Sequence, residues 1–135
     1  MYIKSIMKIV LDSAAFINSQ ILEESEAFTT QDVLNELKDA RSRSVADAAR
    51  AKGSLRVSSA SEEMTEYVRM VAREIGALKK LSETDVGVVA LAFDLHAKLV
   101  TDDFSLQNLA AHLNIEYEGV ARGKINEKKK FKVKE

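Results

Sequence analysis

Short apolar runs alternate with amphipathic segments along this chain, and the alternation predicts strands that are each followed by a helix. Residues 5–13 fit a first strand that is apolar and β-branched toward its end and stops at Asp12. A nearly continuous apolar run of this kind is typical of a central parallel strand that is covered on both faces. Further strands are expected at 55–59, 98–103 and 114–120.

The spacing of apolar residues between these strands predicts helices. Residues 29–40 have one apolar face, and Thr29 followed by Asp32 resembles a capping box, in which side chains bond to the free N–H groups of a helix start. Residues 81–97 begin with a similar pair and are apolar almost all round, which is typical of a buried helix. Further helices are expected at 61–76 and 104–113, and a basic loop with a short helix at 41–53. This order favours an α/β fold with a mainly parallel sheet flanked by helices.

The length and composition narrow the class of protein. The chain of 135 residues fits one domain over 1–120, followed by a basic tail at 121–135 that is a linker, a disordered segment or a last strand. There is no cysteine and there are only two histidines, so any metal would be held by carboxylates, which favour hard cations such as Mg²⁺ or Mn²⁺. No apolar run approaches the length of a membrane span, and a soluble cytoplasmic protein is expected.

The net charge of −1 conceals two basic segments in an acidic chain. Residues 38–56 hold six basic side chains against two acidic ones, and residues 121–135 hold seven against two. A solvated helix and a basic tail would explain either segment alone, but together they make nucleic acid a partner to test. The candidate RNA-binding side chains are Arg41, Arg43, Arg50, Lys52, Lys128, Lys129 and Lys130.

Five acidic residues occupy positions where a parallel sheet gathers its ligands. Asp12 ends the first strand, and Asp102 and Asp103 end a later one, so neighbouring strands would bring them to the same edge. Asp85 lies in the first turn of the apolar helix, and Glu36 lies about 60° from Val33 around its own helix, so it borders the apolar face. Each acid alone has a harmless explanation as a cap or a solvated residue. Together they would form a pocket whose repulsion is tolerable only with cations or protons.

Hydrolysis of a phosphodiester bond is the chemistry that suits such a pocket. Two divalent ions about 3.5–4 Å apart activate water and bind the scissile phosphate, so neither a histidine nor a serine nucleophile is needed. His96 and His112 are interpreted as packing or surface residues. Ser13 and Thr101 flank the acids and would either orient a ligand or water, or satisfy nearby backbone groups.

The motifs resemble those of a known family. "IVLDSAAFI", "VLNEL", "LSETDVGVVALA" and "LVTDDFSLQNLA" have the order and spacing of a PIN-domain ribonuclease over residues 8 to about 118. The combination of "LSETD" with "LVTDDFSLQN" is similar to the Nob-type endonucleases, which mature the 3′ end of small-subunit (16S) rRNA in archaea and eukaryotes.

The resemblance implies a PIN-domain-like α/β/α sandwich and an endoribonuclease that uses one or two Mg²⁺ or Mn²⁺ ions. Matched by motif, Asp12, Glu36, Asp85 and Asp103 take the places of the four family acids, which are catalytic and hold the metal, and Asp102 is an auxiliary ligand. The implied partners are pre-rRNA and the precursor of the small ribosomal subunit. No membrane partner is expected, and a homodimer is left open.

One departure from the Nob pattern bears on the substrate. Nob-type proteins usually continue into a zinc ribbon built from CxxC pairs, whereas this sequence ends at "KKKFKVKE" without a cysteine, so no zinc is expected in it. Either a ribbon follows in a longer protein, or the basic segments hold the RNA instead. Two alternatives therefore stay open: a toxin-type PIN ribonuclease of the VapC kind with an antitoxin partner, and a catalytically silent RNA-binding assembly module.

Overall fold

Five parallel strands form the single sheet of the part of the chain described by a computed structural model, residues 7–17 and 26–120. The strand order is β3-β2-β1-β4-β5, and every neighbouring pair is parallel. The strands are β1 Lys8–Leu11, β2 Glu26–Thr29, β3 Leu55–Val57, β4 Lys98–Val100 and β5 Tyr117–Glu118. The expected parallel sheet is therefore confirmed.

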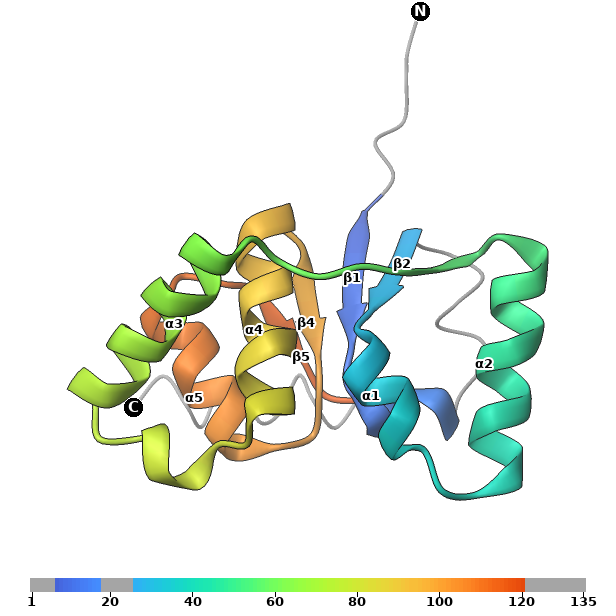
Figure 1. Ribbon diagram of the computed structural model, residues 1–135, viewed down its shortest axis with the longest axis horizontal. Helices are drawn as coiled ribbons and strands as arrows, with labels where there is room; N and C mark the ends of the chain where they lie inside the picture. The colour runs from blue at the N-terminus through green and yellow to red at the C-terminus, as the bar shows by residue number, and fades with distance from the viewer. Residues whose placement is uncertain (1–6, 18–25, 121–135) are drawn as a thin grey trace, which may run out of the picture.

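Helices cover this sheet and lie in two groups (Figure 1). Helices α3, α4 and α5 gather on the side of β4 and β5, whereas α2 lies at the other end against β3. The helices are α1 Gln31–Glu36, α2 Ala40–Lys52, α3 Glu62–Glu74, α4 Glu83–Leu95 and α5 Phe104–His112, with short 3₁₀ helices η1 Ser13–Ile17 and η3 Leu78–Lys80. The flanking helices confirm the α/β fold class.

Strand β1 lies at the centre of the sheet, as its apolar sequence predicts. Ile9, Val10 and Leu11 are at most 3% exposed. Val10 is paired with Phe28 of β2 on one side and with Leu99 of β4 on the other. Full burial of each such side chain contributes roughly 1.5–3 kcal/mol to the stability of the fold. Strand β1 therefore holds the residue that follows it, Asp12, in a fixed position.

Helix α4 is the buried helix that the sequence predicts. Most of its apolar residues are buried around the whole circumference: Val86, Val88, Val89, Ala90, Leu91 and Ala92. The Ser82 hydroxyl accepts a hydrogen bond from the Asp85 N–H, and the Asp85 carboxylate accepts one from the Ser82 N–H, so the predicted capping box is present. His96 ends α4 in a left-handed conformation and is exposed, as is His112 at the end of α5.

The first predicted helix was placed too early and made too long. Thr29 belongs to β2, a strand that the sequence pattern did not reveal, and its hydroxyl donates to the Leu11 carbonyl over 2.8 Å. The helix cap is Thr30, whose hydroxyl accepts from the Val33 N–H at 3.1 Å. Helix α1 ends after six residues because Leu37 turns its backbone to an extended conformation.

The basic segment that follows is one helix of 13 residues, where a loop and a short helix were expected. The Asp39 carboxylate caps its start by accepting from the Ser42 N–H, and this bond lowers the pKa of Asp39. Gly53 ends it with a φ of 81°, a conformation that favours glycine. Within the described residues, no helix is long and apolar enough to cross a membrane. The predicted tail at 121–135 lies outside the described residues.

Candidate active site

The carboxyl ends of β1 and β4 meet at the centre of the sheet. The register pairs Leu11 with Val100, and the Asp12 N–H donates to the Val100 carbonyl over 3.1 Å. Strand order reverses between these two strands, and the carboxyl edge of a parallel sheet at such a reversal is where ligands bind. Asp12 and the segment from Thr101 to Asp103 therefore share this edge, as expected if the two strands are neighbours.

Thr101 connects the two strand ends through its hydroxyl group. Its side chain is 0% exposed. The hydroxyl donates to Asp12 Oδ2 over 2.7 Å and accepts from the Asp103 N–H at 3.1 Å. Gln107 of α5 holds the backbone of Thr101, since its Nε2 donates to the Thr101 carbonyl over 2.8 Å. One buried hydroxyl thus fixes the side chain of Asp12 and the backbone of Asp103 together.

The carboxyl group of Asp12 has a raised pKa. Burial raises its pKa above the ordinary value of 3.8, while the Thr101 hydroxyl and the Ser13 N–H lower it. The negative charges of Asp85 and Asp103 raise the pKa further. These three carboxylates are therefore close enough to repel one another, and a bound cation would relieve that repulsion.

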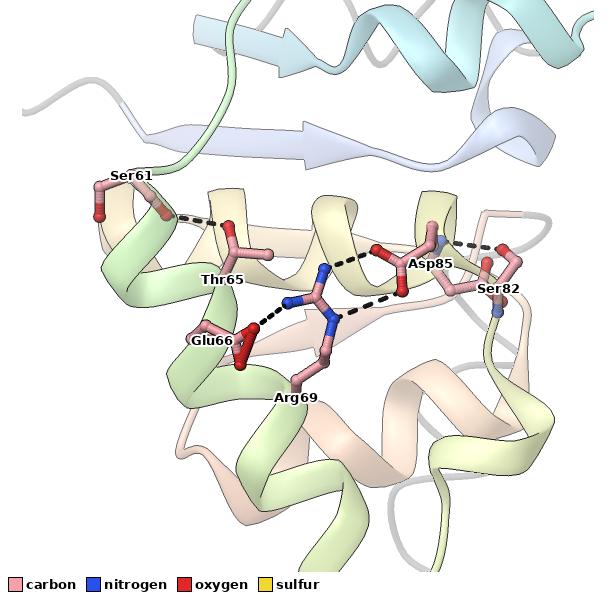
Figure 2. A network of polar contacts seen from close by, with 7 residues as sticks. Ser61, Thr65, Glu66, Arg69, Ser82 and Asp85 are labelled. Atoms are coloured by element: carbon pink, nitrogen blue, oxygen red, sulfur yellow. Dashed lines mark hydrogen bonds and ion pairs between the residues drawn. The ribbon is translucent and has the colours of Figure 1, made fainter.

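The start of α4 brings the remaining two acids to this edge. Asp85 is held by the capping box, in which its Oδ2 accepts from the Ser82 N–H at 3.0 Å. Figure 2 shows Ser82 and Asp85 at the end of the molecule toward which the strands point. Glu36, the last residue of α1, accepts from the Thr84 hydroxyl through Oε2 at 2.7 Å. The end of α1 is thereby joined to the start of α4.

The ion pairs of Arg69 fix the start of α4 from its other side. The guanidinium of Arg69, on α3, lies 2.6 Å from Glu83 Oε1 and 2.7 Å from Glu66 Oε2 (Figure 2). The Arg69 bond lowers the pKa of Glu83, the first residue of α4. Since Glu83 is two residues from Asp85, this pairing anchors the turn of helix that carries Asp85.

The acids have the donor chemistry for a hard divalent cation. Asp85, Asp103 and Glu36 each accept a hydrogen bond through one oxygen. Across residues 7–17 and 26–120 their second oxygens accept none, so these are available to a ligand. No three acidic or histidine side chains of the described part stand ready as one ligand cluster.

Asp102 and Ser13 make different contacts from those acids. Asp102 is exposed, and its Oδ1 accepts from the Val120 N–H at 2.7 Å, which holds the end of the β5 segment. Ser13 begins η1, and it is its backbone N–H that acts on the Asp12 carboxylate. The auxiliary roles expected for Asp102, Ser13 and the Thr101 hydroxyl toward a ligand stay predictions.

The predicted RNA-binding arginines and lysines lie at two ends of α2. Arg41 and Arg43 lie in its first turn, just after the connection from α1, and so on the side of the acids (Figure 1). Arg50 and Lys52 lie in its last turn, where the chain enters β3 at the opposite edge of the sheet. At 1.5 Å per residue these turns are separated by about 15 Å. Lys128, Lys129 and Lys130 lie outside the described residues.

Two side chains that hold the site were not predicted. Thr84 positions Glu36, and Gln107 supports the carbonyl of Thr101. Both stand inside the motifs "LSETD" and "FSLQN", so their positions were visible in the sequence. Their partners were not, because Thr84 and Glu36 are 48 residues apart and meet only through the packing of α1 on α4.

Comparison with known proteins identifies the family. Residues 9–95 match the family described as the PIN domain of ribonuclease. The chain is 35% identical to Endoribonuclease Nob1 of Pyrococcus abyssi over 117 residues, covering 87% of this chain and 71% of that protein. It is 40% identical to Endoribonuclease Nob1 of Methanocaldococcus jannaschii over 123 residues, covering 89% of this chain but 60% of that protein.

Relatives of a second kind match over similar lengths. Ribonuclease VapC3 of Aeropyrum pernix is 38% identical over 120 residues, covering 84% of each chain. Among solved structures, VapBC2 from Rickettsia felis bound to a DNA fragment from their promoter superposes with a TM-score of 0.60 at 17% identity, covering 85% of this chain and 100% of that one. This last likeness concerns the fold alone. With a matched profile over residues 9–95 and relatives of both kinds above 30% identity, the chain belongs to the PIN-domain family of endoribonucleases.

Proposed function

We propose that this protein is an Mg²⁺- or Mn²⁺-dependent endoribonuclease that matures the 3′ end of 16S rRNA in precursors of the small ribosomal subunit. The observation that carries the proposal is the carboxyl edge itself, where the buried Thr101 hydroxyl bonds to Asp12 and to the N–H of Asp103. The charges of Asp85 and Asp103 act on Asp12 at this edge. PIN-domain ribonucleases depend on divalent cations, and these side chains supply suitable oxygen donors.

The metal ligands in this proposal are Asp12, Asp85 and Asp103, with Glu36 and Asp102 at the border. The chemistry that divalent cations supply when bound is stabilisation of charge at the scissile phosphate and activation of water. The protein contributes positioning: Thr101 holds Asp12, and the capping box holds Asp85, each through one carboxylate oxygen. Burial of Asp12 excludes bulk water from one side of the centre, which strengthens its interactions with charge.

Glu36 has a separate place in this scheme. It is exposed at the end of α1, and the Thr84 hydroxyl holds its Oε2 at 2.7 Å. The second oxygen, Oε1, accepts no hydrogen bond from the described residues. The Glu36 side chain that carries it is exposed to solvent. We assign to Glu36 the orientation of a water molecule at the border of the acidic centre, through that second oxygen.

The choice of RNA rests on the relatives. Nob1 proteins of two archaea match nearly the whole chain, and the resemblance of the sequence to Nob-type enzymes supports maturation of 16S rRNA as the activity. The match to VapC3 over 84% of both chains favours a second candidate, a toxin ribonuclease with an antitoxin partner. Growth arrest on expression, relieved by the product of a neighbouring gene, would favour the toxin over the maturation enzyme. A catalytically silent RNA-binding module is the third candidate, and it predicts no cleavage at all.

The test is cleavage of an RNA fragment that spans the 3′ end of 16S rRNA and its trailing sequence. The wild-type protein is expected to cut it with Mn²⁺ or Mg²⁺ and to leave it intact with EDTA. Asp12→Asn is expected to abolish cleavage, since it removes a charged ligand but keeps the shape of the side chain. Asp47→Asn is the matched control, because Asp47 is exposed on α2 and its side chain makes no hydrogen bond or ion pair with another described residue. An intact fragment after incubation of folded wild-type protein with both metals would overturn the proposal.

A further inference from the structure

Three exposed side chains border the acidic edge on the side opposite to α1 and α2. Lys79 and Lys80 end the short helix η3, and Lys80 is two residues before the Ser82 cap. Two peptide steps span at most about 7.6 Å between Cα atoms, so Lys80 lies next to the turn that carries Asp85. Phe104 is the first residue of α5 and directly follows Asp103. Figures 1 and 2 both show η3 beside α5.

Phe104 presents an aromatic ring at this border. It is 71% exposed, the highest value among the large hydrophobic side chains of the described residues. Its backbone is fixed, because Asp103 caps α5 by accepting from the Ser105 N–H at 2.8 Å. A ring held on a rigid helix start next to a catalytic acid offers a face on which an unpaired base can stack.

Lys79 and Lys80 differ from Arg69, the cation that contacts the start of α4. Arg69 is bound in an ion pair with Glu83. Both lysines of η3 are exposed, and no carboxylate of residues 7–17 or 26–120 lies within ion-pair distance of them. An acidic centre repels the phosphates of RNA, so cations outside it are needed to hold the strand. Lys79 and Lys80, whose charges are not neutralised by an ion pair, can bind those phosphates at the border of the acidic centre.

We propose that Phe104, Lys79 and Lys80 form a second RNA contact surface, which receives single-stranded RNA leaving the active site. One base stacks on the ring of Phe104, and the adjoining phosphates lie on the two lysines. Arg41 and Arg43, at the start of α2, contact the strand on the other side of the acids. A strand bound in this way crosses the carboxyl edge from α2 to η3. This inference rests on the proposed ribonuclease function, and it specifies the path of the RNA strand across the protein.

Single-stranded RNA is the class of ligand that this surface fits. Stacking on a protein ring requires a base that is free of its neighbour in a helix, and double-stranded RNA keeps its bases stacked inside. Stacking tolerates every base, so little sequence preference is expected from Phe104. The lysines contribute through charge, which makes binding dependent on salt.

Binding without cleavage tests the surface. The dissociation constant of a fluorescent 12-nucleotide unstructured RNA is measured by anisotropy in EDTA at several salt concentrations. Phe104→Ala is expected to weaken binding about tenfold, and Phe104→Trp to restore it. Lys79→Gln with Lys80→Gln is expected to reduce the slope of log affinity against log salt by about 1.4. The matched control is Lys8→Gln with Lys98→Gln, which removes two charges at the amino ends of β1 and β4, away from the carboxyl edge, and is expected to change the slope less.

The outcomes separate this inference from the function on which it rests. Unchanged affinity in Phe104→Ala, or equal binding of a duplex of the same length, overturns the stacking role. An unchanged slope in the lysine double variant overturns the phosphate contacts. In either case wild-type cleavage of RNA with Mn²⁺ would leave the ribonuclease function intact. Circular dichroism and thermal unfolding of each variant exclude a loss of folding as the cause.

Discussion

Replacement of Thr101 by valine removes the hydroxyl that joins the two strand ends, and it changes little else in size. The variant loses the bond to Asp12 Oδ2 at 2.7 Å and leaves the Asp103 N–H without its acceptor at 3.1 Å. Because Thr101 is 0% exposed, water has no access to replace the hydroxyl. A hydrogen bond to a charged group contributes about 1.5–3 kcal/mol and a neutral one about 1 kcal/mol. Asp12 is only partly buried, so a combined loss of about 2–3 kcal/mol is expected.

The loss is expected to depend on pH in a defined direction. The Thr101 bond lowers the pKa of Asp12, so its removal raises a folded-state pKa that burial already holds above 3.8. When folding raises the pKa of an acid, the folded state loses stability as the pH rises from the unfolded-state pKa to the folded-state pKa of that acid. In Thr101→Val that interval extends further upward. The difference in unfolding free energy between wild type and variant is therefore expected to grow as pH rises from below 3.8 toward neutrality.

Urea unfolding followed by far-ultraviolet circular dichroism measures both effects. With a slope of about 2 kcal/mol per molar urea, the midpoint at neutral pH is expected to fall by about 1 M. Thr65→Val is the matched control, since its hydroxyl donates over 2.9 Å to the Ser61 carbonyl in an exposed helix turn, and a shift below about 0.5 M is expected. Equal shifts in the two variants, or a loss in Thr101→Val that does not change with pH, would refute the bridging role of Thr101.

Three further substitutions test the other supports of the site. Asp12→Asn is expected to weaken Mn²⁺ binding in calorimetry, yet to unfold at a urea concentration no lower than wild type at pH 7, because burial penalises the charged form that it removes. Ser82→Ala breaks the capping box that holds Asp85, so we expect a loss of about 1 kcal/mol in unfolding free energy and weaker Mn²⁺ binding. Unchanged Mn²⁺ binding would contradict the role of the cap in positioning Asp85. Thr84→Val releases Glu36, and we expect a lower kcat for RNA cleavage with a stability change below about 1 kcal/mol; unchanged kcat would contradict the positioning of Glu36.

Much of the architecture was predictable because the signals were strong and local. The apolar run before Asp12 marked the central strand, and the apolar helix with its cap predicted α4. Strand β2 was missed because its four residues, Glu26–Thr29, are too few to show a pattern beside the helix that follows. The end of α1 was missed since Leu37 remains 6% exposed and apolar after the backbone leaves the helix, so the apolar spacing continues.

The meeting of Asp12 and Asp103 at one edge was predictable from strand ends, whereas the side chains that support them were not. Adjacent strands bring Asp12 and Asp103 together, which follows from topology alone. The positions of Asp102 and Asp103 differ by one residue, and only the structure shows that Asp102 bonds to the Val120 N–H while Asp103 acts on Asp12. Such differences depend on side-chain rotamers and on contacts between distant segments, which sequence patterns do not record.

The decisive measurement is cleavage of the RNA fragment spanning the 3′ end of 16S rRNA, with and without Mn²⁺. We expect cuts by the wild type in Mn²⁺, none in EDTA, none by Asp12→Asn, and wild-type cutting by Asp47→Asn. Cleavage by Asp12→Asn at the wild-type rate, from protein free of contaminating nuclease, would contradict the assignment of the active site to the carboxyl edge of β1 and β4.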